Sequence, residues 1–589
     1  MPGDYLHRET AFRFWLTAGA IAGVVLLTYS PSFNHEFVDL DDHFYVVEND
    51  NVNRGLSLES VWWAFSGMRC SNYQPLTLLS HMLDCSLYGL NARGHHATSV
   101  LLHAMNTALV FILMQRLTSM YVASVATALL FGLHPLRVEA VAWIASRKDV
   151  LCGLFFLAAL LAYGAYVRRH VVMGGLHGRL LYIWAVMFHG AALLAKPTAV
   201  TLPGVLLLLD AWPLCRGHKC PTETTVTTWR KLIVEKLPFF ALSSFHALAT
   251  LAAQRTALAS LESVPISLRL ENAVVFLSWQ TWASFCPVGL AASYPYPKAG
   301  FSVEVLAGSV VGLAVLTWAC IALRARLPML LVGWLWFVGM LIPVLGLFQQ
   351  GDQGVADRWT YLPGIGMAFA LAFGGMHAFT WLSARVPPPM ARVAGWAVLG
   401  CLAVALAAMS ARQASYWRDA ETLWRRSATC YPWGDKALTN LGWALHERGR
   451  DDEAMQYFAA GLAVNPRHAD CANILGLLLG QRGLHTQAEA CFRLAIEHRP
   501  GLAPAHGNLG VTLARLEKYK EAEREFSVAL QINPSDPDVL FNHGVFLQNR
   551  GDAAAARARF MQVLSLSPGH AAARQRMSEV MVVTPDVKQ

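Results

Sequence analysis

Hydrophobic runs long enough to cross a lipid bilayer follow one another through the first 410 residues of this chain. No water inside a bilayer can satisfy exposed backbone groups, so each run is expected to form a helix of about 20 residues. With 55% hydrophobic and 15% charged residues, the composition is that of a multi-pass membrane protein and not of a soluble one. The eleven predicted spans are 12–29, 97–115, 119–133, 150–167, 180–195, 198–213, 237–253, 303–323, 328–348, 361–382 and 393–410.

One more hydrophobic run, 268–290, decides the topology. If the N-terminus is cytoplasmic and this run only re-enters the membrane, four of the next five arginines face the cytoplasm. If the run crosses the membrane, four of the five face outward. Positive charge is retained on the cytoplasmic side, so we predict re-entry, with everything after Ser410 outside the cytoplasm. The five arginines are Arg324, Arg326, Arg358, Arg385 and Arg392.

The positive charge of the chain belongs to its membrane part. From Trp433 onward the sequence holds 17 Lys+Arg and 17 Asp+Glu, so the net charge of +8 lies in the first 432 residues. Cations spread among hydrophobic runs indicate membrane orientation and contact with anionic lipid headgroups. We therefore expect membrane lipids as partners and no nucleic acid.

A period of 34 residues organises the C-terminal part. Gly, Ala and Phe recur in step with Pro in each unit, which is the tetratricopeptide pattern of paired helices. The sequence thus predicts an all-α protein: a transmembrane helical domain at 1–410, a linker at 411–432, four repeats with a capping helix at 433–581, and a tail at 582–589. The proline series is Pro432, Pro466, Pro500, Pro534 and Pro568, and the phenylalanine series is Phe458, Phe492, Phe526 and Phe560.

An acidic loop follows the first span closely. Asp39, Asp41 and Asp42 lie a few residues beyond the membrane exit, where clustered carboxylates are costly unless water or a substrate faces them. Adjacent acids point in different directions, so one of Asp41 and Asp42 can act as a base while the other orients a substrate. A solvated acidic loop without a catalytic role explains the same residues.

Cations lie in the next outward loops. Glu139, Arg147, Lys148 and Asp149 fall between the third and fourth predicted spans, and Arg358 falls between the ninth and tenth. Neighbouring cations at a membrane surface suit a lipid phosphate because they offset its charge. Positive residues that meet ordinary headgroups are the alternative interpretation.

Several segments together carry a family resemblance. The chain resembles the bacterial relatives of the transmembrane-and-tetratricopeptide O-mannosyltransferases, in the C-type glycosyltransferase superfamily. This resemblance implies an enzyme of the bacterial cytoplasmic membrane that moves a sugar, with mannose favoured, from a polyprenyl-phosphate carrier to a protein hydroxyl. The segments are FVDLDDHFYVVENDNV (37–52), the run from Asn72 to His96, HPLRVEAVAWIASRKDVL (134–151), KPTAVTLP (196–203), VADRWTYLP (355–363) and YWRD (416–419).

The resemblance also assigns roles to residues. The acidic pair of the family falls on Asp41 and Asp42, and Asp39 stands where a non-acidic residue is expected, so the resemblance leaves the choice of catalytic acid open. The second-loop acid falls on Glu139, with Asp149 as the other candidate. The charge pattern, and not the resemblance, makes Arg147, Lys148 and Arg358 the predicted ligands of the donor phosphate, and a local ion pair with Asp357 is the alternative for Arg358. The acceptor protein is expected to bind through the repeats. No cofactor or metal site is predicted, although paired aspartates are able to bind Mg²⁺ or Mn²⁺.

Two functions of other classes remain open at this point. A non-catalytic membrane-anchored scaffold for envelope protein assembly needs the repeats, but it does not need clustered carboxylates and cations. A transporter of lipid-linked sugars needs polar residues in the middle of the membrane, whereas the residues above gather at the ends of the predicted spans.

The charge count generates a test of topology. Alkaline phosphatase, which is active only outside the cytoplasm, is expected to be active when it is fused after Ser410. An inactive fusion at that position, together with an active fusion after Arg326, would show that the run 268–290 crosses the membrane.

Overall fold

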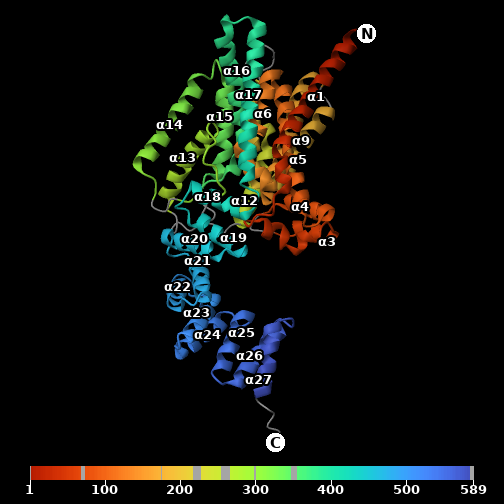
Figure 1. Cartoon of the computed structure of the whole chain (residues 1–589). Coiled ribbons are helices and arrows are strands. Elements are labelled where there is room, and N and C mark those ends of the chain that lie inside the picture. The colour runs from red at the N-terminus through yellow and green to blue at the C-terminus, as the bar shows by residue number, and fades with distance from the viewer. Residues whose placement is uncertain are drawn as a thin grey trace. The chain divides into compact units, whose positions relative to one another are not determined.

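The computed structural model describes residues 2–67, 73–173, 176–216, 227–253, 265–296, 300–346 and 354–583 (Figure 1). The regular elements are helices, and the chain divides into two compact units, Met1–Cys430 and Tyr431–Gln589. The all-α prediction is therefore confirmed for the described residues.

The first unit consists of long apolar helices and short connecting ones. Several of them, such as α4, α15, α16 and α17, begin with Pro, which has no N–H to leave unsatisfied in a first turn. The helices are α1 (Pro2–Tyr29), α2 (Asp50–Asn53), α3 (Leu58–Phe65), α4 (Pro75–Tyr88), α5 (Ala92–Thr118), α6 (Tyr121–Gly132), α7 (Val138–Ala142), α8 (Arg147–Met173), α9 (Leu176–Ala195), α10 (Leu202–Ala211), α11 (Trp229–Glu235), α12 (Leu237–Ala253), α13 (Ile266–Ala283), α14 (Val303–Ala322), α15 (Pro328–Leu341), α16 (Pro363–Leu382), α17 (Pro388–Ser415) and α18 (Ala420–Cys430).

The described residues hold fewer full-length spans than the eleven predicted. Seven helices are long and apolar enough to cross a membrane, and the number rises to nine if two bent pairs each form one span. The bent pairs are Tyr121–Gly132 with Pro135–Ala142, and Trp229–Glu235 with Leu237–Ala252. The predicted spans 198–213 and 328–348 fall on the shorter apolar helices Pro197–Ala211 and Pro328–Val344, which are below the length of about 20 residues that a bilayer requires.

The run 268–290, predicted to re-enter the membrane, is largely the helix α13. It carries Arg269 and Glu271 and is not among the seven long apolar helices. It packs beside α14, with Leu277, Leu313 and Leu316 joining one apolar cluster (Figure 1). Its position relative to a bilayer stays a prediction.

The core of the first unit is built around α5, which packs against α1, α6 and α8. Glycines allow the closest approaches between helices. A Cβ atom at Gly333 of α15 would lie 2.4 Å from the carbonyl oxygen of Gly366 in α16, so only glycine fits there. Small residues at helix contacts are a common means of packing inside a membrane.

The segment 411–432, expected to be a linker, is mostly helical in the structure. Helix α17 continues to Ser415 and α18 covers Ala420–Cys430. Trp417 and Leu423 are buried in the core of the first unit, and the boundary between the units follows Cys430. Apolar side chains at these positions explain why the segment packs instead of extending freely.

The second unit consists of four helix pairs and a last helix, as the 34-residue period predicts. The phenylalanine of each unit is buried against the glycine of the same unit: a Cβ atom at Gly476 would lie 2.8 Å from the ring of Phe492. The predicted tail begins at 582, but the last helix continues to Val583, and 584–589 lie outside the described residues. The helices are α19 (Asp435–Glu447), α20 (Asp451–Val464), α21 (Ala469–Gln481), α22 (His485–His498), α23 (Ala503–Arg515), α24 (Tyr519–Ile532), α25 (Pro537–Asn549), α26 (Ala553–Leu566) and α27 (Ala571–Val583).

Phe492 is expected to contribute strongly to the stability of the repeats. Its side chain is 1% exposed, so Phe492→Ala should lower the free energy of unfolding of fragment 431–589 by about 3–5 kcal/mol. Denaturant unfolding followed by circular dichroism measures this change. Met561→Ala, at a residue that is 53% exposed, is the matched control. Equal stability of the two variants would contradict the proposed packing.

Candidate functional site

The acidic loop lies between α1 and α2, and its three aspartates differ in burial. Asp39 is exposed, Asp41 is half-buried and Asp42 is fully buried. Asp42 precedes a short helical turn, η2 (His43–Val47), which directs the two adjacent carboxylates to different surroundings. Asp41 is therefore the member of the predicted pair that solvent reaches.

Asp42 joins this loop to the segment before α8. Its Oδ2 accepts a hydrogen bond from the backbone N–H of Val38 at 3.0 Å, and its Oδ1 accepts one from Ala145 at 2.8 Å. Burial raises the pKa of Asp42 to about 7, against the opposing effect of these backbone donors. The arrangement suits a carboxyl group that holds two segments together.

Glu139 and Arg358, which are 219 residues apart in the sequence, form an ion pair. Glu139 lies in α7 and Arg358 in the short helix η7 (Asp357–Thr360). Glu139 Oε1 pairs with Arg358 Nη1, and Glu139 Oε2 accepts a hydrogen bond from the backbone N–H of Arg358 at 2.8 Å. Their side chains are 2% and 14% exposed, so the pair lies at the edge of the interior.

Trp143 brings two of the predicted phosphate ligands together. The Arg358 guanidinium carbon lies 5.0 Å from its ring centroid, and Lys148 Nζ lies 5.8 Å from the same ring. Lys148 Nζ also lies 4.9 Å from the ring centroid of Tyr45, which belongs to the acidic loop. Cations over aromatic rings are held by the negative faces of the rings. Burial lowers the pKa of Arg358, but the negative charges of Glu139, Asp149 and, least of the three, Asp41 outweigh it and raise the pKa.

Arg147 is placed differently from its neighbour Lys148. It is fully buried and pairs with Asp84 of α4, and it donates to the backbone carbonyl of His95 at 2.6 Å. Ser80 and Ser99 accept further hydrogen bonds from the same guanidinium. The structure does not bring Arg147 together with Lys148 and Arg358 around Trp143.

Two further buried pairs border the site. Lys196 pairs with Asp149 and is buried, although a lysine at a helix end is ordinarily expected to extend toward water. Asp357 accepts a hydrogen bond from the hydroxyl of Tyr294 at 2.6 Å. Burial, followed by the negative charge of Glu139, raises the pKa of Asp357 well above its usual range.

The charged residues of the site could be identified from the sequence, but the residues that contact them could not. Trp143, Tyr45 and Asp84 each contact a predicted site residue. Of these contacts, only the one between Trp143 and Lys148 joins residues that are close in the sequence. An aromatic residue beside a cation is too common a pattern to single out these positions. Among the described residues, no group of three His, Cys, Asp or Glu is placed to hold a metal ion.

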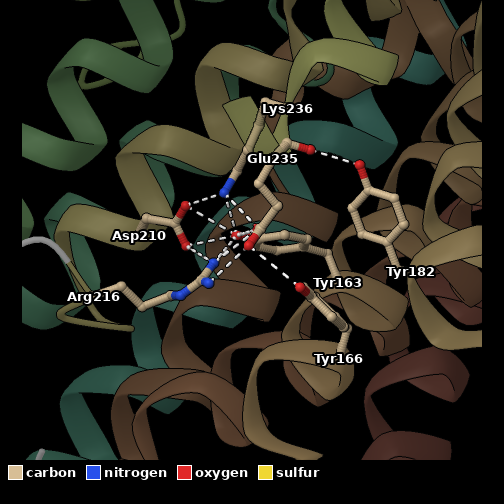
Figure 2. A network of polar contacts seen from close by, with 7 residues as sticks. All are labelled: Tyr163, Tyr166, Tyr182, Asp210, Arg216, Glu235 and Lys236. Atoms are coloured by element: carbon tan, nitrogen blue, oxygen red, sulfur yellow. Dashed lines mark hydrogen bonds and ion pairs between the residues drawn. The ribbon is translucent and has the colours of Figure 1, made fainter. Parts of the chain in front are cut away.

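A second polar network is centred on Tyr163, in the second half of α8 (Figure 2). The hydroxyl of Tyr163 donates to Asp210 at 2.8 Å and accepts from Arg216 at 2.6 Å. Lys236 pairs with Asp210 and lies 2.9 Å from Glu235, which Arg216 also binds at 2.8 Å. Two carboxylates and two cations balance one another, so this network has no net charge that would recruit an ion.

Known proteins resemble this chain in both of its units. Sequence models of the tetratricopeptide repeat match residues 436–465 and 474–537. Human protein O-mannosyl-transferase TMTC1 is 28% identical over 506 residues, which cover 78% of this chain and 56% of the human protein. Mouse protein O-mannosyl-transferase TMTC4 is 26% identical over 510 residues, which cover 77% and 67%. Human protein O-mannosyl-transferase TMTC3 is 22% identical over 492 residues, which cover 76% and 51%.

The chain is thus a distant relative of these O-mannosyl-transferases, and it spans about half to two thirds of their length. Solved structures match smaller parts of the chain, with low TM-scores. The crystal structure of MamA has a TM-score of 0.24 and 17% identity, covering 26% of this chain and 89% of MamA. The tetratricopeptide protein TTC0263 of Thermus thermophilus has a TM-score of 0.25 and 22% identity, covering 30% and 95%.

The raised pKa of Asp42 predicts a pH-dependent stability. The group has a pKa of about 7 in the folded protein and about 4 when unfolded, so the folded state retains its proton longer. Its favourable contribution is present below about pH 4 and is lost as the pH rises to about 7. The melting temperature of the detergent-solubilised protein, relative to that of Asp42→Asn, should therefore fall between pH 5 and pH 8.

Asp50→Asn, at an exposed residue of α2, is the control and should show no such change with pH. A melting temperature that rises with pH relative to Asp42→Asn would mean that the ionised form of Asp42 is the favoured one in the folded protein.

Proposed function

We propose that this chain is a membrane glycosyltransferase that moves a sugar from a polyprenyl-phosphate carrier to Ser or Thr hydroxyls of an extracytoplasmic protein. The observation that carries the proposal is the neighbourhood of Asp41, Lys148 and Arg358 just beyond a helix that can cross a membrane. It combines an accessible acid with two cations at a position where the head of a lipid-linked donor would reach. The distant relationship to protein O-mannosyl-transferases supports the same reaction, with mannose as the favoured sugar.

Asp41 is the proposed general base. A serine or threonine hydroxyl is a weak nucleophile, and a carboxylate within reach can take its proton as the oxygen attacks the anomeric carbon. Asp41 is half-buried, whereas both carboxylate oxygens of Asp42 accept hydrogen bonds from backbone N–H groups. Asp42 is therefore proposed to fix the loop, and Asp41 to carry out the proton transfer.

Lys148 and Arg358 are the proposed ligands of the donor phosphate. The bond between the anomeric carbon and the phosphate oxygen breaks as the acceptor oxygen bonds, and the electron pair leaves with the phosphate. Lys148 and Arg358, which both lie near the ring of Trp143, would stabilise the negative charge that grows on the phosphate. Direct attack of this kind inverts the anomeric centre. Arg147 contributes through the fold, because Asp84 and the carbonyl of His95 occupy its guanidinium.

The repeats are proposed to bind the acceptor polypeptide. Stacked helix pairs of this kind form an extended surface suited to a partner chain. A protein acceptor outside the cytoplasm agrees with the orientation predicted from the arginines, with the enzyme in the bacterial cytoplasmic membrane.

Asp41→Asn should reduce sugar transfer by about 10²–10⁴-fold, because asparagine keeps the size of the side chain and removes its basicity. Radiolabelled transfer from a polyprenyl-phosphate sugar to envelope proteins measures the rate. Asp39→Asn, at an exposed position of the same loop, is the matched control and should retain activity. Transfer by Asp41→Asn within about threefold of the wild type would rule out Asp41 as the base, since even the lower limit of general-base catalysis is larger.

A further inference from the structure

Glu139 and Arg358 hold each other through two contacts of different kinds. One joins Glu139 Oε1 to the Arg358 guanidinium, and the other joins Glu139 Oε2 to the backbone N–H of Arg358 at 2.8 Å. The second contact does not involve the guanidinium. Glu139 therefore keeps a hydrogen-bond donor even when the side chain of Arg358 turns toward another ligand.

The two side chains differ in their access from outside. The Glu139 side chain is 2% exposed and that of Arg358 is 14% exposed. The ring of Trp143 lies beside the guanidinium, with its centroid 5.0 Å from the guanidinium carbon, and supports it on one face. A ligand that enters the site thus reaches Arg358 more easily than it reaches Glu139.

An anion that binds Arg358 has to compete with Glu139. A carboxylate and a phosphate accept the same charge-assisted hydrogen bonds from a guanidinium. Separating the buried Glu139 carboxylate from its cation costs free energy. A neutral ligand binds Arg358 too weakly to offset that cost. A phosphate binds more strongly, because Lys148 lies near the same Trp143 ring as Arg358 and provides a second positive charge.

We infer that Glu139 occupies the guanidinium of Arg358 in the empty site and yields it to the phosphate of the lipid donor. Glu139 keeps its hydrogen bond to the backbone N–H of Arg358 during this exchange. The inference rests on the proposed function and makes Glu139 a positioning residue, which acts through Arg358, instead of a second base. The exchange also makes the site selective for phosphate, since a neutral lipid does not displace Glu139 from the guanidinium of Arg358.

Binding of undecaprenyl phosphate to the full-length protein in detergent tests this inference. Glu139→Gln removes the competing charge, so the Kd should fall by about tenfold, the equivalent of ~1.4 kcal/mol. Arg358→Gln should raise the Kd, and adding Glu139→Gln to it should have no further effect, because Glu139 acts only through Arg358. Glu59→Gln, at an exposed residue of α3, is the control.

The outcomes separate the possible roles of Glu139. Unchanged binding with a large loss of kcat would make Glu139 a base and overturn the inference. Weaker binding in Glu139→Gln, with a lower melting temperature, would make the pair purely structural and overturn it as well. Wild-type binding that does not depend on Arg358 would instead remove the proposed donor site, and this inference with it.

A second variant covers the case in which Glu139→Gln does not fold. Glu139→Asp keeps the charge but is one methylene shorter, so it cannot hold both the guanidinium and the backbone N–H as glutamate does. The Kd for undecaprenyl phosphate should then lie between those of the wild type and Glu139→Gln. A Kd for Glu139→Asp above that of the wild type would contradict the exchange.

Discussion

The burial of charge along α8 is the constraint on which the first unit depends. A charged side chain among apolar helices is tolerated only when it is paired, and α8 carries paired groups toward both of its ends. Arg147 binds Asp84 and Asp149 binds Lys196 at one end, and Tyr163 joins Asp210 and Lys236 at the other. Asp149 and Tyr163 are 14 residues apart, or about 21 Å along a helix. Two polar contacts thus join the segment from Lys196 to Asp210 to α8.

The charged residues at the start of α8 differ in what they contact. Arg147 and Asp149 are committed to partners inside the unit, while Lys148, between them in the sequence, points to the rings of Tyr45 and Trp143. The buried carboxyl of Asp42 holds the acidic loop against the same segment. Two buried, ion-paired residues thus flank Lys148, the proposed phosphate ligand, along one turn of chain.

Several parts of the fold could be predicted because they depend on local pattern. The 34-residue period defined the helix pairs of the second unit, since small and aromatic residues recur wherever those helices meet. The hydrophobic runs located the apolar helices, but fewer of those in the described part of the chain are full-length spans, because some are short or bent, as in Pro197–Ala211 and Tyr121–Gly132. Hydropathy also does not reveal that Trp417 and Leu423, in the predicted linker, pack into the core of the first unit.

The sequence by itself determined which residues are charged near the predicted membrane surface: Asp41, Asp42, Glu139, Arg147, Lys148 and Arg358. Only the tertiary structure decided what each of them contacts. Asp42 and Arg147 are buried with partners, Glu139 and Arg358 are joined across 219 residues, and Asp41 and Lys148 remain partly accessible. The physical reason is that burial and ion pairing depend on which helices pack together. Residues that are neighbours in the chain, such as Arg147 and Lys148, can therefore face entirely different surroundings.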